Sequence, residues 1–375
     1  MNETELITHY SSLIIQSMIA VIADDFTGAA ELAGISLRYG LTVELCVGEV
    51  EYKNADVLVV STDSRSLKKN KAIRITIELL KKILQLKPKL IYKKIDSVLR
   101  GYVLDELKAQ MKVMNRPGAF IMPANPSLGR TIKNEEYFVD GVKITETGFA
   151  HDPEFPITTN TVKKMLDNEV EVLKPNDELP DTGIMVGEVS KPEDYEYWAD
   201  KITEETVLAG AGDFFTALLN KYYKPREQNQ FEMGSPHLYV CGTAFKERKD
   251  FIKKLDCVSW LPGIVDEEWL KRTGDIIDNK QKAVIAVDES TDAALSLRTK
   301  MAKAAREIVA RKKIREIFIE GGSTAAAILE ELNIKTLEPT NELSRGVVRM
   351  KTGDLFITVK PGSYELPEQI KRLYS

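Results

Sequence analysis

Charged residues lie at the ends of three short apolar runs in the first half of the chain, at residues 19–23, 57–61 and 90–95. They are Asp24, Asp25, Asp63, Arg65, Lys93, Asp96 and Arg100. If the runs are parallel strands, these residues meet at the carboxyl edge of one sheet, where α/β proteins bind their ligands. Cationic side chains there can hold an anionic substrate, and a carboxylate can act as a base.

The adjacent carboxylates Asp24 and Asp25 come directly before a helical pattern at residues 29–39. One of them can bind Mg²⁺, or it can accept the proton of a substrate hydroxyl. An aspartate before a helix is also a common N-cap. We expect one of the two residues to have that capping role in any case.

A further motif overlaps the third apolar run and contains Lys93, Asp96, Ser97, Arg100 and Gly101. Lys93 and Lys94 are neighbours in a strand and point to opposite faces, and we choose Lys93 as the lysine that faces the site. An isolated pair such as Asp96 and Arg100 would form a surface salt bridge worth at most about 1 kcal/mol. Because this pair lies at a predicted strand end, we favour a functional role.

Two further arginines are candidates for anion binding. Arg65 lies in the segment STDSRS at 61–66, and arginine holds a carboxylate with two parallel hydrogen bonds, which suits an acid substrate. Arg130 lies in the irregular segment 123–156, where it would reach either a phosphate or a carboxylate. The alternating pattern within that segment favours an ordered hairpin arm.

Glycine-containing turns follow three strand-like runs in the second half of the chain. Gly321 and Gly322 precede a helix start that Ser323 or Thr324 can cap, and the free N–H groups of a helix N-terminus favour phosphate. The other two turns are Cys241-Gly242-Thr243-Ala244 and Lys360-Pro361-Gly362. Three such turns together favour a nucleotide site over plain strand–helix turns, although there is no Walker A sequence and no dinucleotide fingerprint.

Apolar runs alternate with helical patterns along most of the chain, including an amphipathic helix at 69–86 and a long helix at 293–312. This alternation predicts parallel sheets that are covered on both faces. The polar segment 224–236 is the best linker candidate. We therefore predict an α/β fold with two domains, 1–228 and 235–375, each with a largely parallel sheet, and an active site in the cleft between them.

The composition argues against several other classes of protein. The chain has 375 residues, of which 43% are hydrophobic and 29% charged, and its formal net charge is −5. An acidic chain is not a generic partner of nucleic acid or of an anionic membrane, and no segment is long and apolar enough to span a bilayer. Cys46, Cys241 and Cys257 form no zinc or disulfide pattern, so we expect a cytoplasmic protein. Three scattered histidines disfavour a histidine metal site.

The motifs IADDFTGAAELA, STDSRS, KKIDSVLRG and PANPSLGRT together resemble the four-carbon acid sugar kinases. The resemblance implies ATP- and Mg²⁺-dependent phosphorylation of threonate, erythronate or their oxo forms, with a sugar-acid domain followed by a nucleotide domain. It implies a catalytic role for Asp25 and Asp96. The substrate side would contain Asp24, Arg65, Lys93, Ser97, Arg100, Gly101 and Arg130, and the ATP side Gly242, Thr243, Gly321, Gly322, Ser323, Thr324 and Gly362.

The second half departs from the pattern of that family. The family usually has Gly-Gly-Glu-Thr where this chain has Gly321-Gly322-Ser323-Thr324, and Lys-Ser-Gly-Asn-Phe-Gly where it has Lys360-Pro361-Gly362-Ser363-Tyr364-Glu365. Loss of the glutamate removes a contact to Mg²⁺ or to ribose. The resemblance is therefore closer at the sugar-acid site than at the nucleotide site.

Two alternatives to this kinase stay open. The segment Ala209–Thr216, AGAGDFFT, is similar to the signature of ribokinase-like sugar kinases, in which Asp213 would be the base. The altered second half also suits a sugar-acid sensor with weak or no ATP use. The sequence does not define the metal ligands, the stereoisomer of the substrate or the hydroxyl that is phosphorylated, and a homodimer is one candidate for the oligomeric state.

Overall fold

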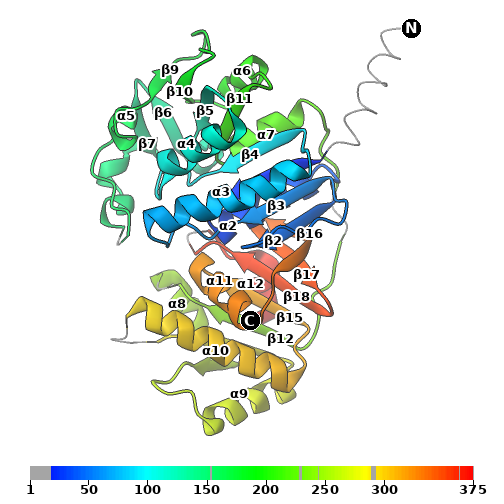
Figure 1. Ribbon diagram of the computed structural model, residues 1–375. Coiled ribbons are helices and arrows are strands. Elements are labelled where there is room, and N and C mark those ends of the chain that lie inside the picture. The colour runs from blue at the N-terminus through cyan, green and yellow to red at the C-terminus, as the bar shows by residue number, and fades with distance from the viewer. Residues whose placement is uncertain are drawn as a thin grey trace. The chain divides into compact units, whose positions relative to one another are not determined.

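A computed structural model describes residues 18–152, 154–227, 230–243, 245–288, 293–362 and 364–374. The chain divides into two compact units, Met1–Arg226 and Glu227–Ser375 (Figure 1). The division falls inside the polar segment that the sequence analysis proposes as a linker. Within the described residues, none of the helices has the length and apolar composition needed to cross a membrane.

The first unit is built on a parallel sheet with the strand order β2-β3-β1-β4-β11-β5-β10-β9. Its strands are β1 (Ile19–Ala23), β2 (Val43–Val47), β3 (Val57–Ser61), β4 (Leu90–Lys94), β5 (Gly118–Met122), β9 (Glu171–Leu173), β10 (Gly183–Gly187) and β11 (Thr206–Gly210). Every residue of β1, β3 and β5 is buried. That burial explains why these strands are nearly continuous apolar runs, and β1 and β3 were predicted at their observed bounds.

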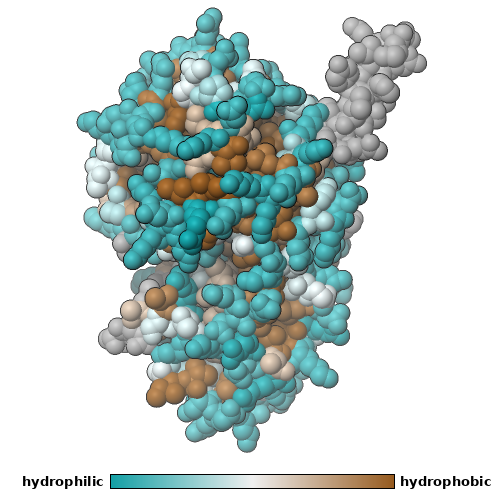
Figure 2. All heavy atoms as spheres, in the orientation of Figure 1, coloured by the Kyte–Doolittle hydropathy of each residue, from teal (hydrophilic) through white to brown (hydrophobic). Residues whose placement is uncertain are grey.

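Helices cover both faces of this sheet. They are α2 (Phe26–Leu37), α3 (Lys69–Gln85), α4 (Val103–Met114), α5 (Val162–Met165), α6 (Glu193–Lys201) and α7 (Gly212–Asn220). Helices α3 and α4 pack together, as do α2 and α7. The apolar side of α3 packs on β1 and β3, while hydrophilic residues cover its outer side (Figures 1 and 2). This is the amphipathic pattern that the sequence predicts for residues 69–86.

The predicted hairpin arm is confirmed between β5 and α5. It consists of the antiparallel strands β6 (Arg130–Lys133), β7 (Glu136–Val139) and β8 (Val142–Lys143). Short 3-10 helices flank them, namely η1 (Pro126–Leu128), η2 (Ile144–Glu146) and η3 (Gly148–His151). The bridge between Ile132 and Val189 ties the arm to the segment that follows β10.

The second unit has the strand order β13-β14-β12-β15-β18-β17-β16. Its strands are β12 (His237–Cys241), β13 (Val258–Trp260), β14 (Lys282–Ala286), β15 (Glu316–Glu320), β16 (Thr336–Ser344), β17 (Val347–Thr352) and β18 (Leu355–Lys360). Pairing is parallel from β13 to β18 and antiparallel from β18 to β16. Its helices are α8 (Lys246–Ile252), α9 (Glu267–Lys280), α10 (Ala294–Lys312), α11 (Gly322–Glu331) and α12 (Glu368–Tyr374). Two α/β units with largely parallel sheets confirm the predicted fold class.

Candidate active site

Arg65 is the centre of a charged cluster at the carboxyl ends of β1, β3 and β4. Its Nε and Nη2 atoms donate to the two oxygens of Asp24 over 2.8 and 2.9 Å. Its Nη1 lies 3.0 Å from Asp25 Oδ2 and 3.5 Å from Asp96 Oδ1. Three carboxylates from two loops therefore share one guanidinium, as expected for residues at one edge of a parallel sheet.

Asp25 has the capping role that we expected for one of the two adjacent carboxylates. Its Oδ1 accepts a hydrogen bond from Gly28 N, and its Oδ2 accepts one from Thr27 Oγ1, both over 2.8 Å. The Asp25 side chain is 20% exposed, compared with 7% for Asp24 and 9% for Asp96. Asp25 is thus the carboxylate of this cluster that a ligand in solution reaches most readily.

Asp96 and Arg100 form a largely buried fork and not a surface salt bridge. Arg100 Nε and Nη2 donate to the two oxygens of Asp96 over 3.0 and 2.9 Å, and Arg100 Nη1 donates to Asp152 over 2.8 Å. The chain does not become helical until Val103, because Leu99 and Gly101 have φ angles of +64° and +92°. A Cβ on Gly101 would lie 3.4 Å from Arg65 Cγ and 3.5 Å from an oxygen of Asp24.

The hairpin arm adds Arg130 to the same region. Arg130 Nη1 donates to Ser97 Oγ. The Phe149 ring lies 5.4 Å from the Arg100 guanidinium and 5.6 Å from that of Arg130, distances at which cation–π attraction applies. Among the described residues, the buried Nε of Arg130 has no hydrogen-bond partner. This arm therefore carries one guanidinium donor that the described residues leave unsatisfied.

A polar cavity of about 360 Å³ has Arg100 and Gly101 in its wall. Residues 154–159, Lys164 and Asp167 complete much of its lining. Cavities of this size accommodate small-molecule ligands. The loop that carries Arg100 therefore borders a space large enough for a small organic acid.

Burial and ion pairing act in opposite directions on the pKa values of this cluster. Burial raises the pKa of Asp24 and outweighs the attraction of Arg65. For Asp25 burial also raises the pKa, but Arg65 and Lys94 outweigh it, and the pKa is lowered. The pKa of Asp96 is lowered further, since Arg65 and Arg100 overcome its burial. Asp25 and Asp96 are therefore ionised at neutral pH.

Lys93 does not occupy the position that we expected. Its side chain is fully buried, and its ammonium pairs with Glu106 of α4. The other lysine, Lys94, lies on the side of α2, where its Nζ is 3.5 Å from Glu31 Oε2 and influences Asp25. Both observations follow from strand alternation, and the sequence offered no means to choose between the two faces.

Asp213, the base in the ribokinase-like alternative, is engaged in a structural contact. Its carboxylate accepts hydrogen bonds from the backbone N and the Oγ of Ser127, over 3.0 and 2.6 Å. The backbone N of Asp213 donates to Asn125 Oδ1 over 3.0 Å. Asp213 thus joins the first turn of α7 to η1, which is a structural role.

The three glycine turns of the second unit meet at the carboxyl ends of β12, β15 and β18. A Cβ on Gly242 would lie 1.9 Å from Thr324 Oγ1, and one on Gly321 would lie 3.8 Å from the carbonyl carbon of Gly242. A Cβ on Gly362 would lie 3.5 Å from Thr243 Oγ1. Gly242 therefore permits a close approach that any side chain would prevent.

The residues predicted to bind nucleotide differ in their accessibility. Gly322 begins α11, and Gly321 precedes it with a φ of +109°. Ser323 is exposed, whereas Thr324 is buried with its hydroxyl towards Gly242. The first turn of α11 therefore offers N–H groups to an anion, while Thr324 packs the turns together.

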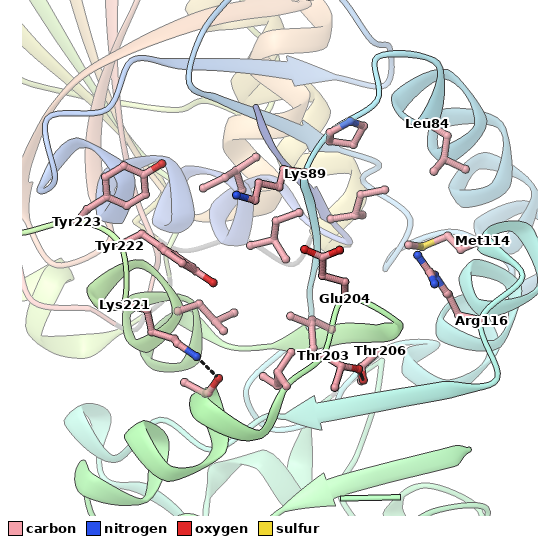
Figure 3. Close-up of a pocket in the computed structure, with 18 residues that line it drawn as sticks. Leu84, Lys89, Met114, Arg116, Thr203, Glu204, Thr206, Lys221, Tyr222 and Tyr223 are labelled. Carbon is pink, nitrogen blue, oxygen red and sulfur yellow. Dashed lines mark hydrogen bonds between the residues drawn. The ribbon is translucent and has the colours of Figure 1, made fainter. Parts of the chain in front are cut away.

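A different, mainly apolar cavity of about 260 Å³ lies at the opposite edge of the first sheet. Its lining includes Ile19, Leu90 and Thr206, which begin β1, β4 and β11. Figure 3 shows Lys89, Tyr222 and Glu204 around it, and Lys221 donating to a backbone carbonyl. Since ligands of parallel α/β sheets bind at the carboxyl ends of strands, this cavity is not the candidate active site.

The carboxylates of the charged cluster are paired with arginines. In the part of the chain that the structure describes, there is no group of three or more His, Cys, Asp or Glu side chains placed to hold a metal ion. Mg²⁺ in phosphoryl-transfer sites is typically bound by substrate phosphates with one or two carboxylates. The described residues do not form an all-protein metal cage.

Comparison with known proteins matches both units to domain families. Residues 19–183 match the sugar-binding N-terminal domain, and residues 271–364 match the nucleotide-binding C-terminal domain. The chain is therefore a two-domain α/β protein with a sugar-binding and a nucleotide-binding part. It belongs to the four-carbon acid sugar kinase family.

Curated relatives match about two fifths of this chain. A D-threonate kinase from Salmonella typhimurium is 35% identical over 155 residues, which are 40% of this chain and 37% of the relative. A 3-oxo-tetronate kinase from Brucella melitensis is 31% identical over 158 residues, which are 40% of this chain and 36% of the relative. The matched region thus spans less than two fifths of these relatives.

Solved structures match nearly the whole fold. Haemophilus influenzae protein HI1011 has a TM-score of 0.75 and 19% identity, with coverage of 94% of this chain and 98% of that one. A Bordetella bronchiseptica protein, crystallised as a domain-swapped dimer with bound citrate, has a TM-score of 0.50 and 20% identity, with coverage of 95% and 98%. At these identities the likeness concerns the fold alone.

Proposed function

We propose that this protein is an ATP-dependent kinase that phosphorylates a hydroxyl of a four-carbon sugar acid of the threonate, erythronate or oxo-tetronate type. The observation that carries the proposal is the convergence of Asp25, Arg65, Asp96, Arg100 and Arg130, of which Arg100 also lines a polar cavity. This cluster lies in the unit that matches a sugar-binding domain. The names of the curated relatives support the choice of substrate class.

The arginines have different parts in this proposal. Arg65 uses its donors on Asp24, Asp25 and Asp96, so it orients the carboxylates and does not hold the substrate. Arg100 and Arg130 flank the Phe149 ring, and the buried Nε of Arg130 has no partner among the described residues. Arg130 therefore binds the carboxylate of the sugar acid, and Arg100, whose Nε, Nη1 and Nη2 donate to Asp96 and Asp152, contributes positive charge beside it.

Asp25 orients the substrate hydroxyl and accepts its proton. It is ionised at neutral pH and is the most exposed carboxylate of the cluster. A carboxylate with a lowered pKa is a weak base, but phosphoryl transfer has a loose transition state in which positioning and charge neutralisation dominate. Asp96 contributes by fixing Arg65 and Arg100.

The glycine turns of the second unit bind the phosphates of ATP. The N–H groups of Gly322 and Ser323 begin α11, and the approach of Gly242 to Thr324 leaves the turn free of side chains. Mg²⁺ bound to the nucleotide would neutralise phosphate charge. Transfer requires the sugar acid and the nucleotide to be brought together during the reaction.

Two further properties belong to this proposal. An ATP-dependent kinase with three buried, unpaired cysteines suits the reducing cytoplasm. A homodimer is the oligomeric state to test, since a protein of the same fold crystallised as a domain-swapped dimer. Light scattering after size-exclusion chromatography measures that state directly.

ADP release measured with a panel of four-carbon acids tests the activity. The panel contains both enantiomers of threonate and erythronate together with 3-oxo-tetronate, and Asp25→Asn is the control variant. We expect turnover with at least one acid and its loss in the variant. Stabilisation by a sugar acid but not by MgATP in a thermal-shift assay would instead favour the sensor, which the serine at position 323 motivates.

A further inference from the structure

Glu320 is a fully buried carboxylate at the end of β15, directly before Gly321 and Gly322. It receives hydrogen bonds or ion pairs from three other elements of the second unit. Lys360 Nζ, at the end of β18, lies 3.0 Å from Oε1. Arg248 Nε, on α8, lies 3.0 Å from Oε1 and 2.8 Å from Oε2. The Tyr239 hydroxyl, on β12, donates to Oε2.

The Lys360 ammonium is also bound to the backbone of the turn that follows it. It donates to the carbonyl oxygens of Pro361 over 2.7 Å and of Gly362 over 3.4 Å, and to that of Tyr364. Because this side chain is fully buried and its donors are occupied, Lys360 does not contact a phosphate. It fixes the backbone at Pro361, Gly362 and Tyr364 instead.

One carboxylate is therefore connected to all three glycine turns. Glu320 is adjacent in sequence to Gly321, and it pairs with Lys360, which donates to the carbonyl of Gly362. It also accepts hydrogen bonds from Tyr239 and Arg248, which lie before and after the Gly242 turn. Buried ion pairs often contribute little net stability compared with apolar residues of the same volume. We expect the contribution of this cluster to lie mainly in fixing geometry.

We propose that Glu320 is the positioning residue of the nucleotide site, holding the three glycine turns in the arrangement that binds the phosphates of ATP. The proposal rests on the proposed kinase function. It adds a role for a residue that is not in the set predicted to touch nucleotide. The Glu320 carboxylate lies directly before the two glycines and is buried beneath the turns. There it contacts Arg248 and Lys360 and not the ligand.

Glu316 provides a matched control on the same strand. It is fully buried as well, and it pairs with Arg349 over 2.7 and 2.9 Å. Four residues of a strand place it about 13 Å from Glu320, at the end away from the turns. Glu316→Gln and Glu320→Gln thus remove the same charge from the same strand, each from a pair with arginine.

The experiment measures the dissociation constants of MgADP and of a sugar acid by calorimetry for the unaltered chain and for both variants, with their melting temperatures. We expect Glu320→Gln to weaken MgADP binding about tenfold or more, and to leave sugar-acid binding unchanged. Glu316→Gln should lower the melting temperature without weakening MgADP binding. Lys360→Met should weaken MgADP binding as Glu320→Gln does, since both release the backbone that Lys360 fixes.

Equal MgADP affinity in the Glu320→Gln and Glu316→Gln variants would overturn the inference while leaving the kinase proposal intact. The same holds if MgADP affinity falls in proportion to melting temperature in all variants. Failure of the unaltered chain to bind MgADP would overturn the proposed function and this inference with it. If Glu320→Gln does not fold, Lys360→Met decides by the same comparison.

Discussion

Glu106→Gln should destabilise the first unit far more than its single lost charge suggests. The Glu106 side chain is 2% exposed, and it accepts hydrogen bonds from Lys93 Nζ and, over 2.6 Å, from Ser64 Oγ. Removing one partner of a buried pair leaves the other charge uncompensated, which costs about 3–5 kcal/mol. Against a total stability of about 5–15 kcal/mol, such a loss is large.

The double variant Lys93→Met/Glu106→Leu separates this cause from general damage to the core. It removes both charges together, and exchanging a buried pair for apolar residues is often close to neutral. Ser64 loses one acceptor, at a cost of about 1 kcal/mol, but keeps its 2.7 Å hydrogen bond with Thr62. We therefore expect the double variant to be much more stable than Glu106→Gln.

Urea unfolding followed by tryptophan fluorescence measures both effects. The chain has three tryptophans, and replacing Trp260 and Trp269 by phenylalanine leaves the fully buried Trp198 as a reporter of the first unit. Glu169→Gln, in an exposed bridge to Lys108, is the control and should cost less than about 1 kcal/mol. A Glu106→Gln variant as stable as this control would refute the role assigned to the Lys93 pair.

Three other predictions concern the candidate active site. Gly101→Val should weaken sugar-acid binding about tenfold or more in calorimetry, because a Cβ there already contacts Arg65 and Asp24 and the valine methyls extend beyond it, whereas Gly141→Val, with a φ of +78° but no atoms within 4 Å, should not; equal effects would contradict the role of these contacts. Asp25→Asn should lower kcat by about 10²–10⁴-fold with MgADP affinity intact, and a rate near that of the unaltered chain would exclude it as the base. The lowered pKa of Asp96 gives stability that is complete above about pH 4, its unfolded value, and that is lost as the pH falls through its folded pKa. Asp96→Asn should therefore destabilise the chain most at neutral pH and progressively less as the pH falls below about 4, and a deficit that is the same at pH 7 and pH 2 would contradict the linkage.

The sequence was sufficient for those elements whose residues are buried on all sides. The strands β1 and β5 are apolar throughout and are followed by Asp24 and Pro123, and β3 is apolar up to its last residue, Ser61, so their bounds are visible in the residues themselves. The antiparallel strands β16 and β17 were not predicted. Their burial is mixed and their register shifts near Pro339 and Glu342, which weakens the alternation on which a strand prediction depends.

The sequence predicts most of the residues that form the candidate site, but not which of them pair with one another. Asp24, Asp25, Arg65, Asp96 and Arg100 each lie after a recognisable strand, and the carboxyl edge of a parallel sheet brings them together. Which arginine orients the carboxylates and which one binds the substrate depends on contacts between residues that are distant in sequence. Phe149 and Asp152 come from the arm, 49 and 52 residues after Arg100, and no local pattern connects them.

Lys93 and Glu320 show the same physical rule in the two units. Both are charged residues at the end of a buried strand, which is also where a ligand-binding residue is expected. A charge at that position can either face the ligand or lie beneath the loops and meet an opposite charge, and the two cases have the same sequence signature. Full burial with an ionic partner distinguishes the second case, because an ion withdrawn from water is tolerated only when it is paired. Such pairs draw together loops that are distant in sequence, so the loops that carry Arg65 and Gly362 depend on charges that no substrate touches.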